Sequence, residues 1–95
     1  MTDENKIAVV KSSWELHDQV ETAYLKHPAN QDDVDWLQKQ RFLLANMALH
    51  LLQTAIKPGD INRERLRDNL RAILVISDQF IPKVGLKEIN VYDDK

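Results

Sequence analysis

Apolar residues recur at helical spacing in three long stretches of the chain that contain neither proline nor glycine. The stretches are separated by Pro28, by the pair Pro58-Gly59 and by Pro82. Proline lacks an amide donor and clashes with the preceding helical turn, so each of these sites marks the end of a helix. The pattern predicts three helices, at about residues 4–26, 33–57 and 63–81.

Polar residues stand where the predicted helices begin. Thr2 or Asp3 can cap the first helix, Asp32 or Asp33 the second, and Asn62 the third, because their side-chain oxygens can accept unpaired first-turn amides. Short connections between helices of similar length favour an all-α fold, an antiparallel three-helix (up-down-up) bundle in a single domain over residues 1–95. We expect residues 82–95 to form an irregular tail whose last three residues are mobile.

The middle helix is more apolar than one buried side requires. Of the 15 positions from 42 to 56, 11 are apolar, and they lie all round the helix. The third helix has an uninterrupted apolar run at residues 72–76. Burial contributes roughly 1.5–3 kcal/mol for each Leu or Ile, so this surface predicts association, either as a homodimer or with a partner protein. The alternative is a monomer in which tail residues Leu86, Ile89 and Val91 cover the surface.

Two sets of side chains are predicted to carry the contact. We expect the apolar contact to use Phe42, Leu49, Leu52 and Leu74. A charged binding face is expected at Arg63, Arg67 and Arg71, which are spaced by four along one side of the third helix. Guanidinium groups can hold carboxylates or phosphates. The alternative is an ordinary solvated face, in which Glu64 and Asp68 pair with these arginines.

Two histidines raise the question of a metal or acid–base site. His17 and Glu21 are four residues apart and share a helix face, which is the spacing of paired helical ligands, and Asp18 lies beside them. A structural site needs further ligands, and His50 is the only other helical histidine. We interpret His17 as a surface histidine beside acids, and predict no metal and no cofactor. His50 is predicted to lie at the boundary between two helices, hydrogen-bonded or pointing to water.

Composition excludes several classes of function. The net charge of −2, with 13 Lys and Arg against 15 Asp and Glu, argues against electrostatic binding to nucleic acid or to membranes. The longest apolar run is far shorter than a membrane span. The chain has no Cys, which fits a cytoplasmic location. It has no nucleophile elbow and no phosphate-binding glycine loop, so we expect no catalytic residues.

The stretch from Leu43 to Ser77 resembles the small helical bacteriocin-immunity proteins in Met47 and in the sequence Ala55-Ile56-Lys57 before a polar loop. The chain is one helix short of that family's four-helix pattern, and we assign no family. Two hypotheses follow. The first is a small non-enzymatic protein interaction module, such as an adaptor, inhibitor, immunity factor or chaperone. The alternative is a small enzyme or ligand-binding protein whose site forms between subunits from histidine and arginine residues.

Overall fold

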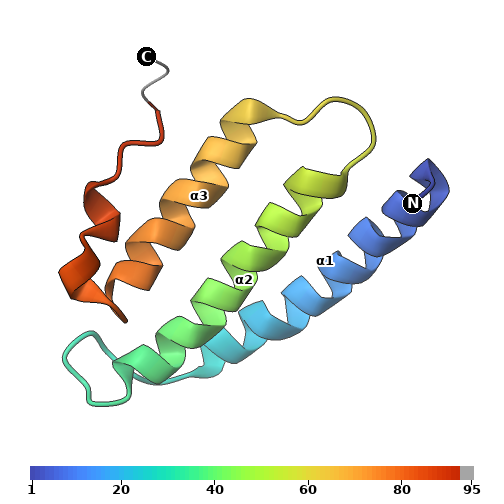
Figure 1. The fold of residues 1–95 in the computed structure, drawn as a ribbon. Helices are drawn as coiled ribbons and strands as arrows, with labels where there is room; N and C mark the ends of the chain where they lie inside the picture. Colours follow the sequence, from blue (N-terminus) through green and yellow to red (C-terminus); the bar gives the residue numbers. More distant parts are fainter. Residues whose placement is uncertain (93–95) are drawn as a thin grey trace.

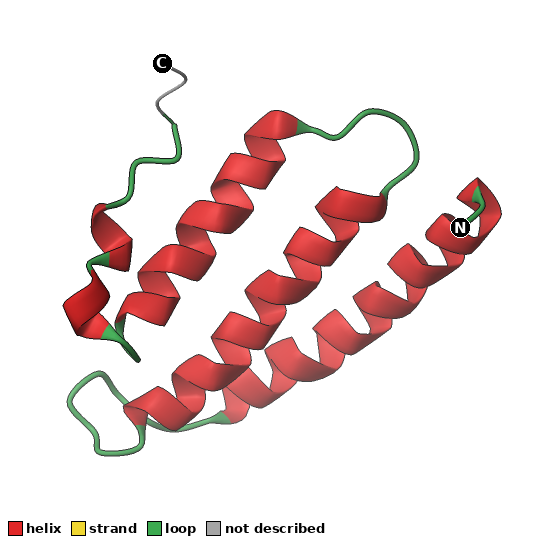
Figure 2. Ribbon diagram, viewed as in Figure 1, coloured by secondary structure: helices red, strands yellow, loops and turns green. Residues whose placement is uncertain are grey.

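The computed structural model describes residues 1–92 and contains helices and loops but no strand in that range (Figure 2). The predicted all-helical class is therefore confirmed. In chain order the elements are α1 (Asp3–Lys26), α2 (Trp36–Ile56), α3 (Arg63–Asp78) and two short 3₁₀ turns, η1 (Pro82–Val84) and η2 (Leu86–Glu88) (Figure 1). The prediction of mobility for the last three residues lies outside the described residues.

Side-chain caps begin two of the helices as predicted. The Thr2 hydroxyl accepts a hydrogen bond from the Asn5 amide at 3.1 Å, and the Asn62 side-chain oxygen accepts one from the Arg65 amide at 3.1 Å. Each cap satisfies a first-turn amide that has no partner within its helix. The starts of α1 and α3 are thus local properties of the sequence.

Two predicted boundaries were wrong. Helix α2 begins at Trp36 instead of residue 33, because the Asp33 carboxylate accepts the Asn30 amide at 2.7 Å and belongs to the preceding turn. Helix α3 ends at Asp78 instead of residue 81. There the Phe80 amide bonds to the Ser77 carbonyl at 2.9 Å, which closes a tighter turn than an α-helix makes.

The three helices form an open layer. Helix α2 packs against α1 on one side and α3 on the other, and α1 and α3 make no comparable contact with each other in residues 1–92 (Figure 1). The molecule measures 45 × 38 × 16 Å. Its radius of gyration is 15.1 Å, whereas a closed domain of this length has about 12 Å. The closed bundle expected from the sequence would bring α1 and α3 together, and the structure does not.

Burial within the layer is inverted relative to an ordinary core. In residues 1–92 the buried apolar residues are only Ala29 and Ile76, which are 3% and 6% exposed. The buried polar residues are more numerous; they are Ser13, His17, Gln40, Asn46, Gln53 and Asp78. Polar side chains therefore occupy most of the fully buried positions, and the apolar side chains of the helices are mostly half-buried or exposed.

The tail follows α3. Arg71 donates to the Lys87 carbonyl at 2.6 Å, and the Tyr92 hydroxyl donates to Asp68 at 2.7 Å. Both turns, η1 and η2, contact α3, and Ile89 remains exposed. The tail therefore lies along α3, where Leu86 and Val91 are half-buried. None of the described helices combines the length and apolar character needed to cross a membrane.

Candidate functional site

One side of α2 is a largely apolar surface, which we call the α2 apolar face. Helical spacing places its residues on adjoining rows of that helix. They are Leu37, Phe42, Leu44, Ala45, Ala48, Leu49, Leu52 and Ala55. Phe42 is 37% exposed, and Ala45, Ala48 and Ala55 are exposed as well. Of the predicted contact residues, Phe42 is thus exposed and Leu49, Leu52 and Leu74 are half-buried, but nothing in the structure tests their role.

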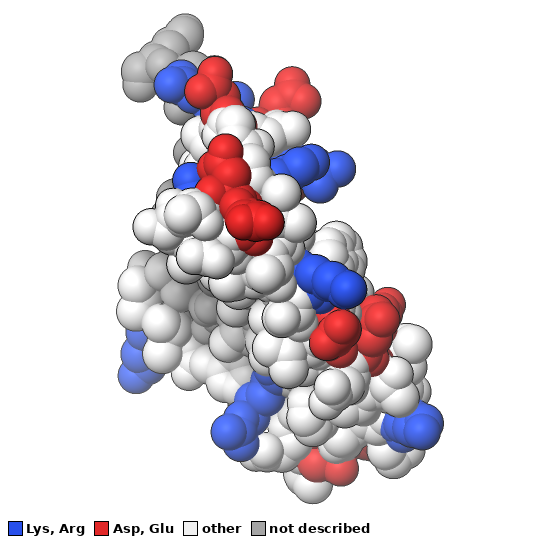
Figure 3. All heavy atoms as spheres, turned by 90° about the vertical axis from the view of Figure 1, so that its right-hand side faces the viewer, with Lys and Arg blue, Asp and Glu red and all other residues white. Residues whose placement is uncertain are grey.

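A shallow groove continues this face toward the end of α3. Its volume is about 580 Å³, and Leu37, Leu44, Ala48 and Phe80 contribute to its lining. Gln38 and Arg41 also line it. Helical spacing places Arg41 between Leu37 and Ala45, so this largely apolar groove contains one charged side chain. On the face that Figure 3 displays, acidic and basic side chains are interspersed, with no large area of one sign.

Three aromatic rings cluster between α1 and α2. The Nε2 atoms of His17 and His50 lie 3.0 Å apart, and the two ring centroids are 4.6 Å apart at 77°. Trp14 makes edge contacts with both histidine rings, at 5.0 and 5.7 Å between centroids. The prediction of a surface His17 was wrong: the residue is 8% exposed, because it faces α2. The prediction that His50 is hydrogen-bonded at the boundary between two helices is confirmed.

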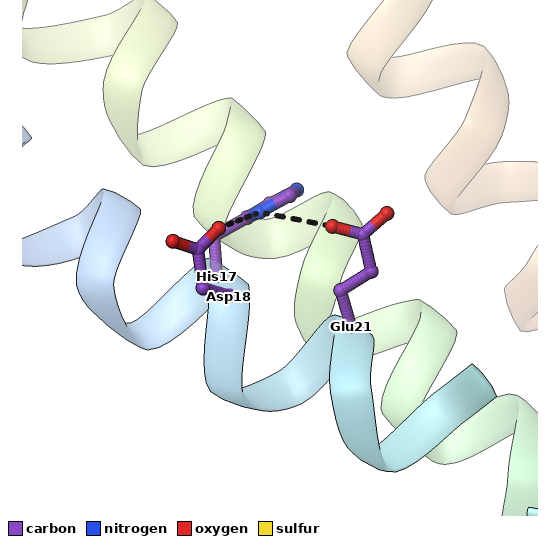
Figure 4. Close-up of side chains that lie close together, drawn as sticks. All are labelled: His17, Asp18 and Glu21. Atoms are coloured by element: carbon purple, nitrogen blue, oxygen red, sulfur yellow. Dashed lines mark ion pairs between the residues drawn. The ribbon is translucent and has the colours of Figure 1, made fainter. Parts of the chain in front are cut away.

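The second ring nitrogen of His17 points between two carboxylates. His17 Nδ1 lies 3.5 Å from Asp18 Oδ1 and 3.7 Å from Glu21 Oε2, as the dashed lines in Figure 4 mark. This nitrogen is buried and has no hydrogen-bond partner. The three side chains could hold a cation, since their donor atoms lie within 4.8 Å of one another.

The pKa of His50 lies below the ordinary value for histidine. Its pKa is lowered chiefly because partial burial disfavours the charged ring, and the neighbouring His17 lowers it further. The negative charge of Glu21 raises the pKa of His50, and the positive charge of Arg65 lowers it by a smaller amount. The neutral ring, which has one nitrogen free to accept a hydrogen bond, is therefore favoured at neutral pH.

The arginine row is divided between different surroundings. Arg71 is bound to the tail through the Lys87 carbonyl, whereas Arg63 is exposed and Arg67 is half-buried. Arg65 instead joins His50 and Trp14 in a polar groove of about 660 Å³. The binding role predicted for the row stays a prediction.

Sequence reasoning missed the buried amides. The indole of Trp36 donates to Gln79 Oε1 at 2.9 Å, and Gln79 donates to Gln40 Oε1 at 3.0 Å, which ties the start of α2 to the residue after α3. Asn46 and Gln53 are also buried, and each has a side-chain atom without a partner. Their spacing of seven residues was a signal that they share one side of α2.

Comparisons of the chain with protein-family models, with curated proteins and with solved structures find no match. The α2 apolar face and the cluster around His17 therefore carry the functional inference.

Proposed function

We propose that the protein is a small non-enzymatic interaction module that binds protein through the α2 apolar face, and that its first partner is a second copy of itself. The observation that carries this proposal is the inverted burial on α2. Most of its amide side chains are buried, while Leu37 and Phe42 are exposed. Leu44, Leu49 and Leu52 are only half-buried. Exposed apolar surfaces of this kind mark contact sites on small proteins. Because the chain has no Cys, we further propose a cytoplasmic location.

The amount of exposed surface supports a homodimer. The chain has an accessible surface of 6992 Å² at a mass of 11.1 kDa. A compact monomer of this mass exposes about 5,700 Å². The accessible surface of this subunit is therefore about 1,300 Å² larger than that of a compact monomer. Stable interfaces bury about 800 Å² on each partner, and obligate homodimers bury more. The excess is therefore enough for one dimer interface.

In the proposed dimer, two open layers stack with their α2 apolar faces together. Each subunit contributes its antiparallel, up-down-up set of helices to a dimeric bundle with a shared core. Phe42, Leu49 and Leu52 supply the buried centre from α2, and Leu74 adds to it from α3. Arg63, which is exposed, would add charge selectivity toward a further partner.

The test is a charge placed in the middle of the face. Ala48 is exposed, so Ala48→Glu leaves the subunit intact but buries two carboxylates in a symmetric interface. Burying an unpaired charge costs about 3 kcal/mol or more, which corresponds to at least about 100-fold in the dissociation constant. Ala8→Glu, at an exposed position of α1, is the matched control. Sedimentation equilibrium over a concentration series measures both constants.

The wild-type chain and Ala8→Glu should dimerise alike, and Ala48→Glu should be monomeric where they are dimers. A wild-type chain that stays monomeric up to about 1 mM, with no binding of an apolar dye, would contradict the proposal. Equal dimerisation of Ala48→Glu would show that another surface is used.

A second candidate function has one specific observation in its favour. His50 and Arg65, the residue types that a ligand site would use, line the same 660 Å³ groove together with Trp14 and Asn69. The groove lining balances Lys57 and Arg65 against Asp60 and Asp68. A small polar ligand bound there would raise the melting temperature in a screen of phosphorylated metabolites. Arg65→Gln should abolish that increase, and no increase with any compound would leave the interaction module as the better proposal.

A further inference from the structure

We propose that His17, Asp18 and Glu21 form a binding site for a divalent first-row transition-metal ion such as Zn²⁺, and that His50 orients His17 for it. This proposal concerns the α1–α2 contact and does not depend on the dimer. Imidazole nitrogen and carboxylate oxygens are ligands that Zn²⁺ accepts in proteins.

The first support is the distance between donor atoms. The separations of 3.5 and 3.7 Å from His17 Nδ1 to Asp18 Oδ1 and Glu21 Oε2 are too long for hydrogen bonds, which span about 2.7–3.2 Å. Two donors that share a tetrahedral Zn²⁺ ion, at bond lengths of about 2.1 Å, lie about 3.4 Å apart. The observed separations therefore match two ligand–ligand edges around such an ion.

The second support is the state of His17 itself. Although the residue is only 8% exposed, Nδ1 has no hydrogen-bond partner, and it points into the space between the carboxylates (Figure 4). A buried polar atom without a partner costs free energy. Trp14 and His50 hold the ring on its other side, so Nδ1 is already placed as a ligand. A cation between Nδ1 and the two acids satisfies all three groups.

The third support is the contact with His50. Two ring nitrogens 3.0 Å apart require that one carries the proton and the other accepts it. When a metal ion occupies His17 Nδ1, the ring proton lies on Nε2 and is donated to His50 Nε2. Metal-binding histidines almost always donate their second ring nitrogen in this way, which fixes the tautomer and the ring orientation. His50 is thus a positioning residue.

The two acids can complete the site. Their side chains are 80% exposed at Asp18 and 49% exposed at Glu21, so they are free to turn toward the ion. Water supplies the remaining position, because the cluster offers three ligands. Since the ion fixes the proton that His17 donates to His50, bound metal strengthens the contact between α1 and α2.

The test is calorimetric titration of the chelator-treated, full-length protein with Zn²⁺, together with Co²⁺ titration followed by visible absorption. We expect one ion per chain. Asp18→Asn and Glu21→Gln should each weaken binding at least about tenfold, and His50→Asn should weaken it about 10- to 100-fold without changing the stoichiometry. Glu15→Gln, an exposed acid on the same helix, is the matched control and should bind as the wild type does.

A second control tests whether the ion binds at His27 instead. His27 also lies near an acid, with its Nε2 atom 4.0 Å from Asp35 Oδ2. Binding lost in His27→Gln and retained in Glu21→Gln would overturn the proposal. So would the absence of saturable heat and of Co²⁺ absorption bands. Circular dichroism of each variant confirms that the helices are intact before the constants are compared.

Discussion

Replacing Gln53 by methionine should stabilise the protein. Gln53 is 8% exposed, and its Nε2 group is buried without a hydrogen-bond partner. Such a donor costs about 1–3 kcal/mol relative to a residue that has no polar group to satisfy. Methionine has nearly the same length and shape and adapts to its surroundings, so it leaves no cavity and causes little strain. We expect Gln53→Met to raise the free energy of unfolding by about 1–2 kcal/mol.

The assay is urea denaturation followed by circular dichroism, with a thermal scan as a second measure. For a domain of this size, each 1 kcal/mol raises the melting temperature by roughly 4–8 °C. All samples must have the same protein concentration, because dimerisation couples stability to concentration. Gln19→Met, at an exposed position of α1, is the control and should change stability by less than about 0.5 kcal/mol. A loss of stability in Gln53→Met that the control lacks would refute the reasoning, since the amide would then be paired.

Two further predictions concern single hydrogen bonds. Asn62→Ala removes the cap that accepts the Arg65 amide, and should lower the free energy of unfolding by about 0.5–2 kcal/mol in urea denaturation; no change would mean that the cap does not stabilise α3. The pKa of Tyr92 is raised above its usual value because its hydroxyl donates to the Asp68 carboxylate. Asp68→Asn should therefore lower the midpoint of phenolate absorption, measured in a Tyr24→Phe background, and an unchanged midpoint would contradict that contact.

The helices could be predicted because their signals are local. Proline positions and the caps at Thr2 and Asn62 act within a few residues of the boundaries they set. The start of α2 was predicted too early because that prediction rested on the residue type at one position. Asp33 is a good cap by residue type, but its carboxylate is used by the Asn30 amide in a turn. Residue type alone does not distinguish a helix cap from a turn of this kind.

The candidate site could be predicted only in part. The spacing of His17 and Glu21 placed them on one face of a helix, and the excess of apolar residues on α2 indicated an uncovered surface. Apolar periodicity assigns polar residues to solvent, so it put His17 outside and overlooked Gln53. The open layer was also beyond reach, because it depends on which sides of the helices meet and not on where each helix begins and ends.

The open layer has a consequence for how the molecule loses its structure. Helix α1 packs on α2 and makes no comparable contact with α3 in the described residues. Its detachment therefore leaves the α2–α3 pair and the tail with their own contacts. Local opening follows contiguous units that share few contacts with the rest of a protein. Backbone amides of α1 should accordingly exchange with solvent deuterium as one group, separate from the group formed by α3 and the tail, and Zn²⁺ bound at His17 would slow the α1 group selectively.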